Sequence, residues 1–196
     1  MIHPVFPTPV GIYNIGSMTE SEIDKMTNLP THGNMYNLTS DDHYVLDTYS
    51  SLSVLPKITE TLNQYLRDVY QPKFEVKAEI TQSWINLTNK GHSHHRHRHP
   101  NSHISGVYYV STTPQDKIMF INPFFYTWKL ETDNYNVFNS QEWWFEAEQG
   151  FLILFPSTLE HYVNPVLTDT ARISLSFNTV LRGHLGDERT LTYLKL

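Results

Sequence analysis

The spacing of apolar residues changes along the chain and divides it into a helical first part and a β-rich second part. Apolar side chains recur every three or four positions from Leu52 to Val69, which predicts an amphipathic helix. A shorter helix is predicted over residues 19–28, where Thr19 can cap an acidic first turn. We therefore expect residues 17–71 to form helices that support a sheet.

The second part consists of short segments that are rich in β-branched and aromatic residues and are separated by turns. These segments are FEVKAEITQSWINLT, SHISGVYYVST, KIMFINP, GFLILFPS and ARISLSFNTVL. Many short strands that follow helices favour a mainly β fold, a double-stranded β-helix of the jelly-roll, cupin-like type with supporting N-terminal helices. We expect residues 72–182 to form this jelly-roll core within a single domain that spans residues 1–196.

Two further segments have their own patterns. Residues 1–16 alternate apolar side chains with prolines and small residues, which predicts an extended arm at the edge of a sheet. Residues 124–149 are too long for a hairpin turn and are unusually aromatic, with Trp128, Trp143 and Trp144, which predicts a loop that lines a substrate site at the barrel mouth. The arm and the aromatic loop leave room for a homodimer contact.

The composition limits the classes of partner and of metal ligand. The 14 basic and 20 acidic residues give a formal charge of -6, which argues against a nucleic-acid partner and against binding to an anionic membrane. The chain has no cysteine, so a metal site must use His, Asp or Glu. The first residues, MIHPVFPTPV, lack a basic stretch followed by a long apolar run, and no segment reaches the length of a membrane span, so we expect a cytoplasmic protein.

The stretch HSHHRHRHP places five histidines in nine positions, shortly before the predicted strand SGVYYV. In an extended chain every second side chain shares a face, so His95, His97 and His99 are expected on one face. His94 and Arg96 are expected on the other face. Two imidazoles two residues apart on a strand can bind one metal ion, and a third ligand must then come from elsewhere in the fold.

The best candidate for that third ligand is His161, which stands alone in PSTLEHYVNP after the strand GFLILF, where a jelly roll returns to the same rim. On the strand RISLSFN, alternation places Arg172 and Ser174 on one face. A lone arginine beside a serine inside a barrel predicts an anion-binding site. Arg172 could instead close an ion pair with an acidic neighbour such as Glu160 or Asp169.

Taken together, these motifs resemble the iron(II)/2-oxoglutarate-dependent oxygenase superfamily, whose members hold iron in a jelly roll. The resemblance rests on His-x-His, followed by a distant histidine and then by Arg-x-Ser. Within the superfamily, FPTPV, SWIN, HRHPNSHISGVYYV, INP, GFLILFPSTLEHYVNP and ARISLSFN are similar to a small 2OG-Fe(II) oxygenase family known mainly from bacterial and phage genomes. The similarity covers the arm and most of residues 80–178.

The resemblance implies an enzyme that uses Fe(II), O2 and 2-oxoglutarate as co-substrate. Such an enzyme couples the oxidative decarboxylation of 2-oxoglutarate to hydroxylation of a substrate, which the sequence does not identify. The resemblance makes His97 and His161 iron-binding imidazoles. It implies no catalytic residue beyond the metal site.

The resemblance also implies a set of residues for the co-substrate. Arg172 is expected to pair with the distal carboxylate of 2-oxoglutarate, assisted by Ser174. Tyr109 matches a tyrosine that reaches the same carboxylate in prolyl-hydroxylase-like relatives. Asn86, in SWIN, is a further candidate for the pocket.

One position departs from the superfamily pattern, which usually has Asp or Glu two residues after the first histidine. This chain has His99 there. Either His99 is the third ligand of a three-histidine site, or water or an anion fills the position, and a register that uses His95 and His97 also stays open. Two other functions stay open as well, a cupin-like three-histidine metalloenzyme that does not use 2-oxoglutarate and a non-catalytic metal-binding jelly-roll protein.

Overall fold

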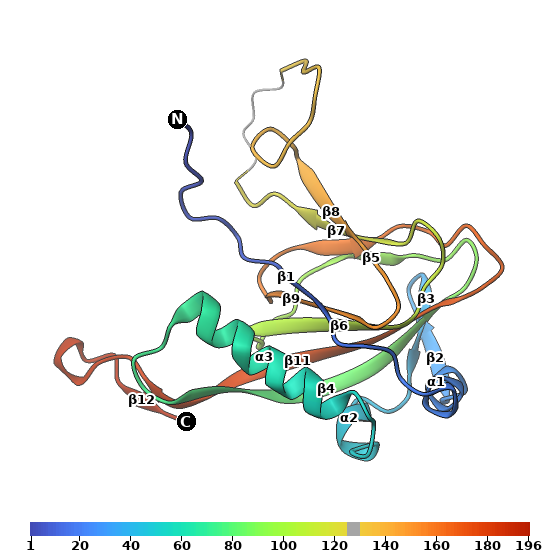
Figure 1. Ribbon diagram of the computed structural model, residues 1–196, viewed down its shortest axis with the longest axis horizontal. Coiled ribbons are helices and arrows are strands. Elements are labelled where there is room, and N and C mark those ends of the chain that lie inside the picture. Colours follow the sequence, from blue (N-terminus) through green and yellow to red (C-terminus); the bar gives the residue numbers. More distant parts are fainter. Residues whose placement is uncertain (125–129) are drawn as a thin grey trace.

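Two antiparallel sheets form the body of the protein (Figure 1). The computed structural model describes residues 1–124 and 130–196. The eight-stranded sheet runs in the order β1 (Gly11–Asn14), β9 (Phe151–Pro156), β6 (Ile104–Ser111), β11 (Arg172–Leu185), β4 (Val76–Thr88), β3 (Asn37–Ser40) and β2 (Thr31–Asn34), with β12 (Leu194–Lys195) paired to β11. The four-stranded sheet runs in the order β5 (His94–His97), β10 (His161–Val163), β7 (Lys117–Ile121) and β8 (Glu142–Glu146). The predicted mainly β fold is confirmed.

The two helices expected from the sequence pattern are present. Helix α1 (Glu20–Thr27) begins at Thr19, which forms a capping box with Glu22. A single turn, α2 (Val45–Thr48), precedes α3 (Leu55–Tyr70), which lies on the face of the large sheet that is turned away from the small sheet (Figure 1). The apolar stripe of α3 is buried there through Ile58, Leu62, Tyr65 and Leu66. Within the described residues, no helix is both long and apolar enough to cross a membrane.

The segment between α1 and α2, which was expected to belong to the helical support, forms the hairpin β2–β3. The strand propensity of this segment is low, and its pairing with β4 decides its structure. Ser40, which is fully buried, accepts a hydrogen bond from the backbone N–H of Ile85 at 3.0 Å. The region expected to supply only helical support therefore also adds two strands to the large sheet.

The expected arm and aromatic loop differ in part from the structure. Within residues 1–16, only the four residues of β1 pair with the sheet, at its edge beside β9. Within residues 124–149, β8 pairs with β7 along its whole length and carries Trp143 and Trp144. Trp128 lies outside the described residues.

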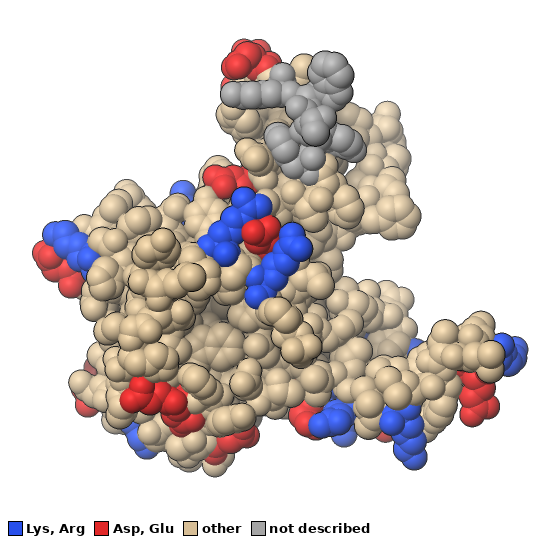
Figure 2. All heavy atoms as spheres, turned by 180° about the vertical axis from the view of Figure 1, so that it is seen from behind, with Lys and Arg blue, Asp and Glu red and all other residues tan. Residues whose placement is uncertain are grey.

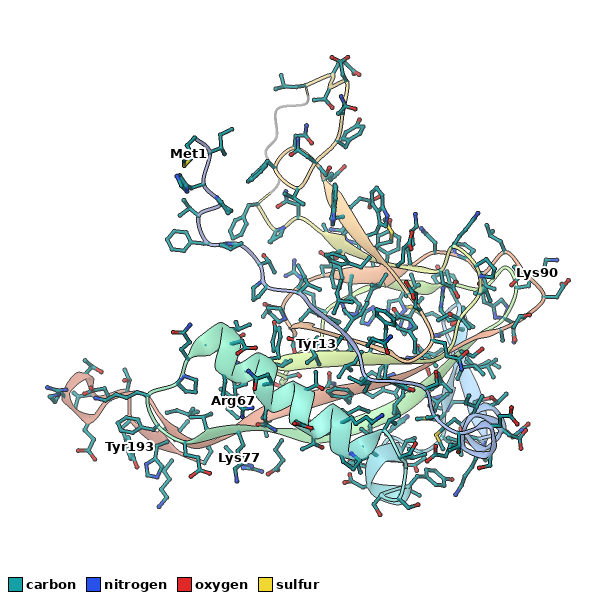
Figure 3. All side chains as sticks on the ribbon, in the orientation of Figure 1. Met1, Tyr13, Arg67, Lys77, Lys90 and Tyr193 are labelled. Carbon is teal, nitrogen blue, oxygen red and sulfur yellow. The ribbon has the colours of Figure 1, made fainter. Side chains whose placement is uncertain are left out.

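The space between the two sheets has an apolar part and a polar part, and side chains fill it (Figure 3). The apolar part holds Tyr109, Ile118, Phe120, Ala147, Ile153, Phe155 and Leu159. The polar part holds the buried His161 on β10, the buried Asn86 and Thr88 on β4, and the buried Arg172 and Ser174 on β11. The polar end is where the candidate functional residues gather.

Candidate metal centre

Three imidazoles from neighbouring strands meet at the polar end. His97 ends β5 and lies directly opposite His161 on β10, while His99 follows two residues later. One nitrogen from each of the three lies within 4.8 Å of the others. The Nε2 atoms of His99 and His161 are 3.3 Å apart, and their rings are nearly parallel. The pairing of β5 with β10 is therefore what assembles the cluster.

Backbone carbonyls orient two of these rings. Nδ1 of His97 lies 2.7 Å from the carbonyl oxygen of His95, and Nδ1 of His161 lies 3.1 Å from that of Leu159. Because a carbonyl oxygen can only accept, each Nδ1 carries the hydrogen and each Nε2 keeps its lone pair. This is the arrangement in which a histidine binds a metal through Nε2.

The third ring, His99, is held by two neighbours. The indole of Trp84 on β4 stacks on it, with ring centroids 5.8 Å apart. The side chain of Asn178 on β11 forms a hydrogen bond with it that raises its pKa, but burial has the larger effect and lowers that pKa to about 4. Packing and a hydrogen bond thus fix the ring beside His161.

The cluster is neutral at neutral pH. Burial lowers the pKa of His161 well below its ordinary value of 6.5, and the neighbouring His97 and His99 lower it further. Burial also lowers the pKa of His97. Neutral imidazole is the form that binds a metal, so the donor set fits a divalent transition-metal ion.

The strand β5 contains a bulge that changes the face of His94. Three residue steps from His94 to His97 lie opposite two steps from Val163 to His161. The extra residue turns His94 to the same side as His97, and their rings stack with centroids 4.6 Å apart. Strict alternation had placed His94 on the opposite face, so that prediction is wrong. Arg96 does point away and pairs with Glu160.

Arg172, expected to bind an anion, is already paired within the chain. Its Nη1 donates to Oδ1 of Asp116 at 2.8 Å, and both side chains are buried. The other carboxylate oxygen of Asp116 accepts from the backbone N–H of Thr113 at 2.7 Å. The sequence had suggested Glu160 or Asp169 as structural partners, but Glu160 pairs with arginines of the histidine run and Asp169 with a lysine. Asp116 was missed because it stands in the turn TTPQDK, which carries no motif.

The other expected co-substrate residues form one row across the large sheet. Ser174 lies opposite Asn86 on one side and Tyr109 on the other, so the three side chains share a face. Asn86 is bonded within the sheet, because its amide nitrogen donates to Ser176 Oγ at 3.0 Å. Burial raises the pKa of Tyr109 above its ordinary range, so its hydroxyl remains a donor at neutral pH.

Solved structures of 2-oxoglutarate oxygenases share this fold. HygX from Streptomyces hygroscopicus, with nickel, 2-oxoglutarate and hygromycin B bound, is 12% identical and aligns over 88% of this chain and 82% of its own, with a TM-score of 0.57. A Pseudomonas putida prolyl-4-hydroxylase is 14% identical over 90% of this chain and 94% of its own, with a TM-score of 0.53. A 2OG-Fe(II) oxygenase-family oxidoreductase from Burkholderia pseudomallei is 15% identical over 81% and 76%, with a TM-score of 0.55. At these identities the likeness establishes the double-stranded β-helix fold.

Comparison at the level of sequence identifies the family. No curated protein matches the chain. A family profile described as "Putative 2OG-Fe(II) oxygenase" matches residues 82–178. This span runs from within β4 to within β11 and includes His97, His99, His161 and Arg172. Over residues 82–178 the chain therefore matches this 2OG-Fe(II) oxygenase family.

Proposed function

We propose that this protein couples the oxidative decarboxylation of 2-oxoglutarate to hydroxylation of a substrate, with His97, His99 and His161 as the ligands of Fe(II). The observation that carries the proposal is the convergence of these three imidazoles, two of them with Nδ1 held by a carbonyl. In this proposal His99 takes the place of the usual carboxylate ligand. When bound, Fe(II) supplies the coordination positions at which 2-oxoglutarate and O2 react.

The residues of the large sheet hold the co-substrate in this proposal. Nη1 of Arg172 donates to Asp116 and Nη2 donates to the carbonyl oxygen of Asn164 at 3.5 Å, and in this proposal the other N–H groups of the guanidinium bind the distal carboxylate of 2-oxoglutarate. Ser174 and the protonated hydroxyl of Tyr109 donate beside it, with Asn86 as a further wall of the pocket. Burial of Arg172 and His161 keeps water away and strengthens each of these contacts.

The pairing of Arg172 with Asp116 favours a second candidate function. Because Asp116 neutralises the guanidinium, a three-histidine metalloenzyme that does not use 2-oxoglutarate is compatible with the same site. Such an enzyme needs the three histidines but not Arg172. Full activity in an Arg172→Ala variant would therefore favour it over the oxygenase.

The proposal carries expectations about partners and location. Lys and Arg lie next to Asp and Glu in small groups on the face seen in Figure 2, which supports a small-molecule or neutral partner over a nucleic acid. We propose that residues 1–196 act as one domain in the cytoplasm. We also propose that the arm and the aromatic loop form a homodimer contact.

An anaerobic titration with Fe(II) and 2-oxoglutarate tests the proposed function. We expect the weak visible metal-to-ligand charge-transfer band of the chelated co-substrate. The band should be lost in folded His97→Ala and Arg172→Ala variants and kept in His92→Ala, a change at an exposed histidine of the same run. If iron binds and no band forms, the 2-oxoglutarate proposal fails and the second candidate takes its place.

A further inference from the structure

Three histidines of the run, His92, His94 and His95, remain outside the centre described above, and the rings of His94 and His95 contact that of His97. Nitrogens of His94, His95 and His97 lie within 4.8 Å of one another, as in the first group. The ring centroids of His94 and His95 lie 4.6 Å and 4.9 Å from that of His97. The bulge in β5 creates this second group, because without the extra residue His94 would face away from His97.

His94 is oriented as a metal ligand by a buried amide. Its Nδ1 lies 3.1 Å from Nδ2 of Asn37, which is 3% exposed. Among the described residues, Oδ1 of Asn37 is buried and has no hydrogen-bond partner. With the amide turned over, that oxygen accepts from the Nδ1–H of His94, and the amide nitrogen takes the position without a partner instead. In that orientation Nε2 of His94 is free, as it is in His97 and His161.

His95 supplies a second unsatisfied atom. Its Nδ1 is buried and, within the described part of the chain, has no hydrogen-bond partner. A buried nitrogen without a partner costs free energy, and a bound cation would remove that cost. A pocket of about 450 Å³ lined by His94 and His95, together with Tyr36, Glu142 and Tyr162, gives access to the group.

We propose that His94, His95 and His97 form an outer transition-metal site that shares His97 with the inner centre. One Nε2 atom binds one ion, so the two sites compete for His97 and only one is filled at a time. The outer site borders the pocket, whereas His161 of the inner site is 4% exposed. An ion that enters from the surface therefore meets the outer site first and reaches the inner site by exchange of ligands around His97.

Cobalt(II) binding to the His161→Ala variant tests the outer site, because this change removes a ligand of the inner site alone. We expect one equivalent of Co(II) in the wild-type protein and still one equivalent in His161→Ala, with a changed visible spectrum. The double variant His161→Ala/His95→Ala should bind none. The matched control, His161→Ala/His92→Ala, should keep the full equivalent, since His92 belongs to neither group.

Three results would overturn the outer site. The first is loss of Co(II) binding in a His161→Ala protein that circular dichroism shows to be folded. The second is an equal loss of Co(II) binding in His161→Ala/His92→Ala and in His161→Ala/His95→Ala. The third is binding of two equivalents of Co(II) by the wild-type protein, because two ions cannot share His97. The proposed function depends on the inner site and is judged separately by the 2-oxoglutarate band. Failure of one proposal therefore leaves the other standing.

Discussion

Arg172 and Asp116 form a buried ion pair at the start of β11, with Nη1 of Arg172 2.8 Å from Oδ1 of Asp116 and side chains that are 3% and 5% exposed. The arginine expected to hold the co-substrate thus already has one carboxylate beside it. Removing one partner of such a pair leaves an uncompensated buried charge. The contribution of this ion pair to the stability of the fold is therefore coupled to the binding of any second anion at Arg172.

An Asp116→Asn substitution separates these effects. We expect it to lower the free energy of unfolding by about 3–5 kcal/mol, because it leaves the guanidinium of Arg172 buried without a counter-charge. Under the proposed function, 2-oxoglutarate supplies the missing carboxylate and should raise the Tm of the variant by more than it raises that of the wild type. Thermal melts with and without 2-oxoglutarate measure both changes. An equal ligand shift in the two proteins would show that the distal carboxylate does not reach Arg172.

Metal addition should stabilise the folded protein through His97. An ion that binds only the folded state at 100 times its Kd adds about 2.7 kcal/mol of stability. We expect Ni(II) to raise the Tm of the wild type, EDTA to reverse the increase, and His97→Ala to abolish it, since His97 belongs to both histidine groups. The exposed His92→Ala variant serves as the control. A nickel effect that survives in His97→Ala would place the bound ion elsewhere.

The stability of the metal-free protein should fall as the pH falls. His99 and His94 have a pKa of about 4 and about 3 in the folded state, against 6.5 for an ordinary histidine, chiefly because of burial. Between these values the unfolded chain binds more protons than the folded one, so acid favours unfolding. The stabilisation is complete above pH 6.5 and declines toward pH 4.

Urea unfolding at about pH 7.5 and about pH 5 measures this decline. A His99→Gln variant has one histidine fewer to titrate and should show a shallower dependence. A wild-type stability that stays constant between the two conditions would contradict the burial of neutral histidines.

A close contact between β6 and β11 predicts the effect of adding one methyl group. A Cβ at Gly106 would lie 2.1 Å from Cζ of Phe177, whose side chain is fully buried. We expect Gly106→Ala to destabilise the protein by about 1–3 kcal/mol through overpacking. Gly33→Ala on β2 is the matched control, because an added Cβ meets nothing within 4 Å there. Chemical denaturation of the two variants compares them, and equal stabilities would mean that Phe177 can move aside at little cost.

Much of the fold follows from local pattern. The three- and four-residue spacing over α3 and the runs of β-branched residues in β6, β9 and β11 depend on one face of each element being buried, and burial leaves a clear trace in sequence. The hairpin β2–β3 leaves no such trace. Its strands are short and polar, and pairing with β4 creates them.

The candidate metal centre could be predicted only in part, because some of its contacts also depend on the pairing of strands that are distant in sequence. His97, His99 and His161 come together as the motif spacing suggested. The side on which His94 lies depends on one extra residue in β5, which alternation does not reveal. Asp116 and Asn37 are ordinary polar residues in sequence, and only the contacts between distant strands place them beside Arg172 and His94.

The stacking of Trp84 on His99 gives the protein a built-in optical reporter. The two ring centroids are 5.8 Å apart, so a paramagnetic ion held by His99 sits within quenching range of the indole. Trp143 and Trp144 lie on β8, at the far edge of the small sheet from β5. The part of the emission that comes from Trp84 can therefore report the arrival of a paramagnetic ion beside His99, without a dye or a label.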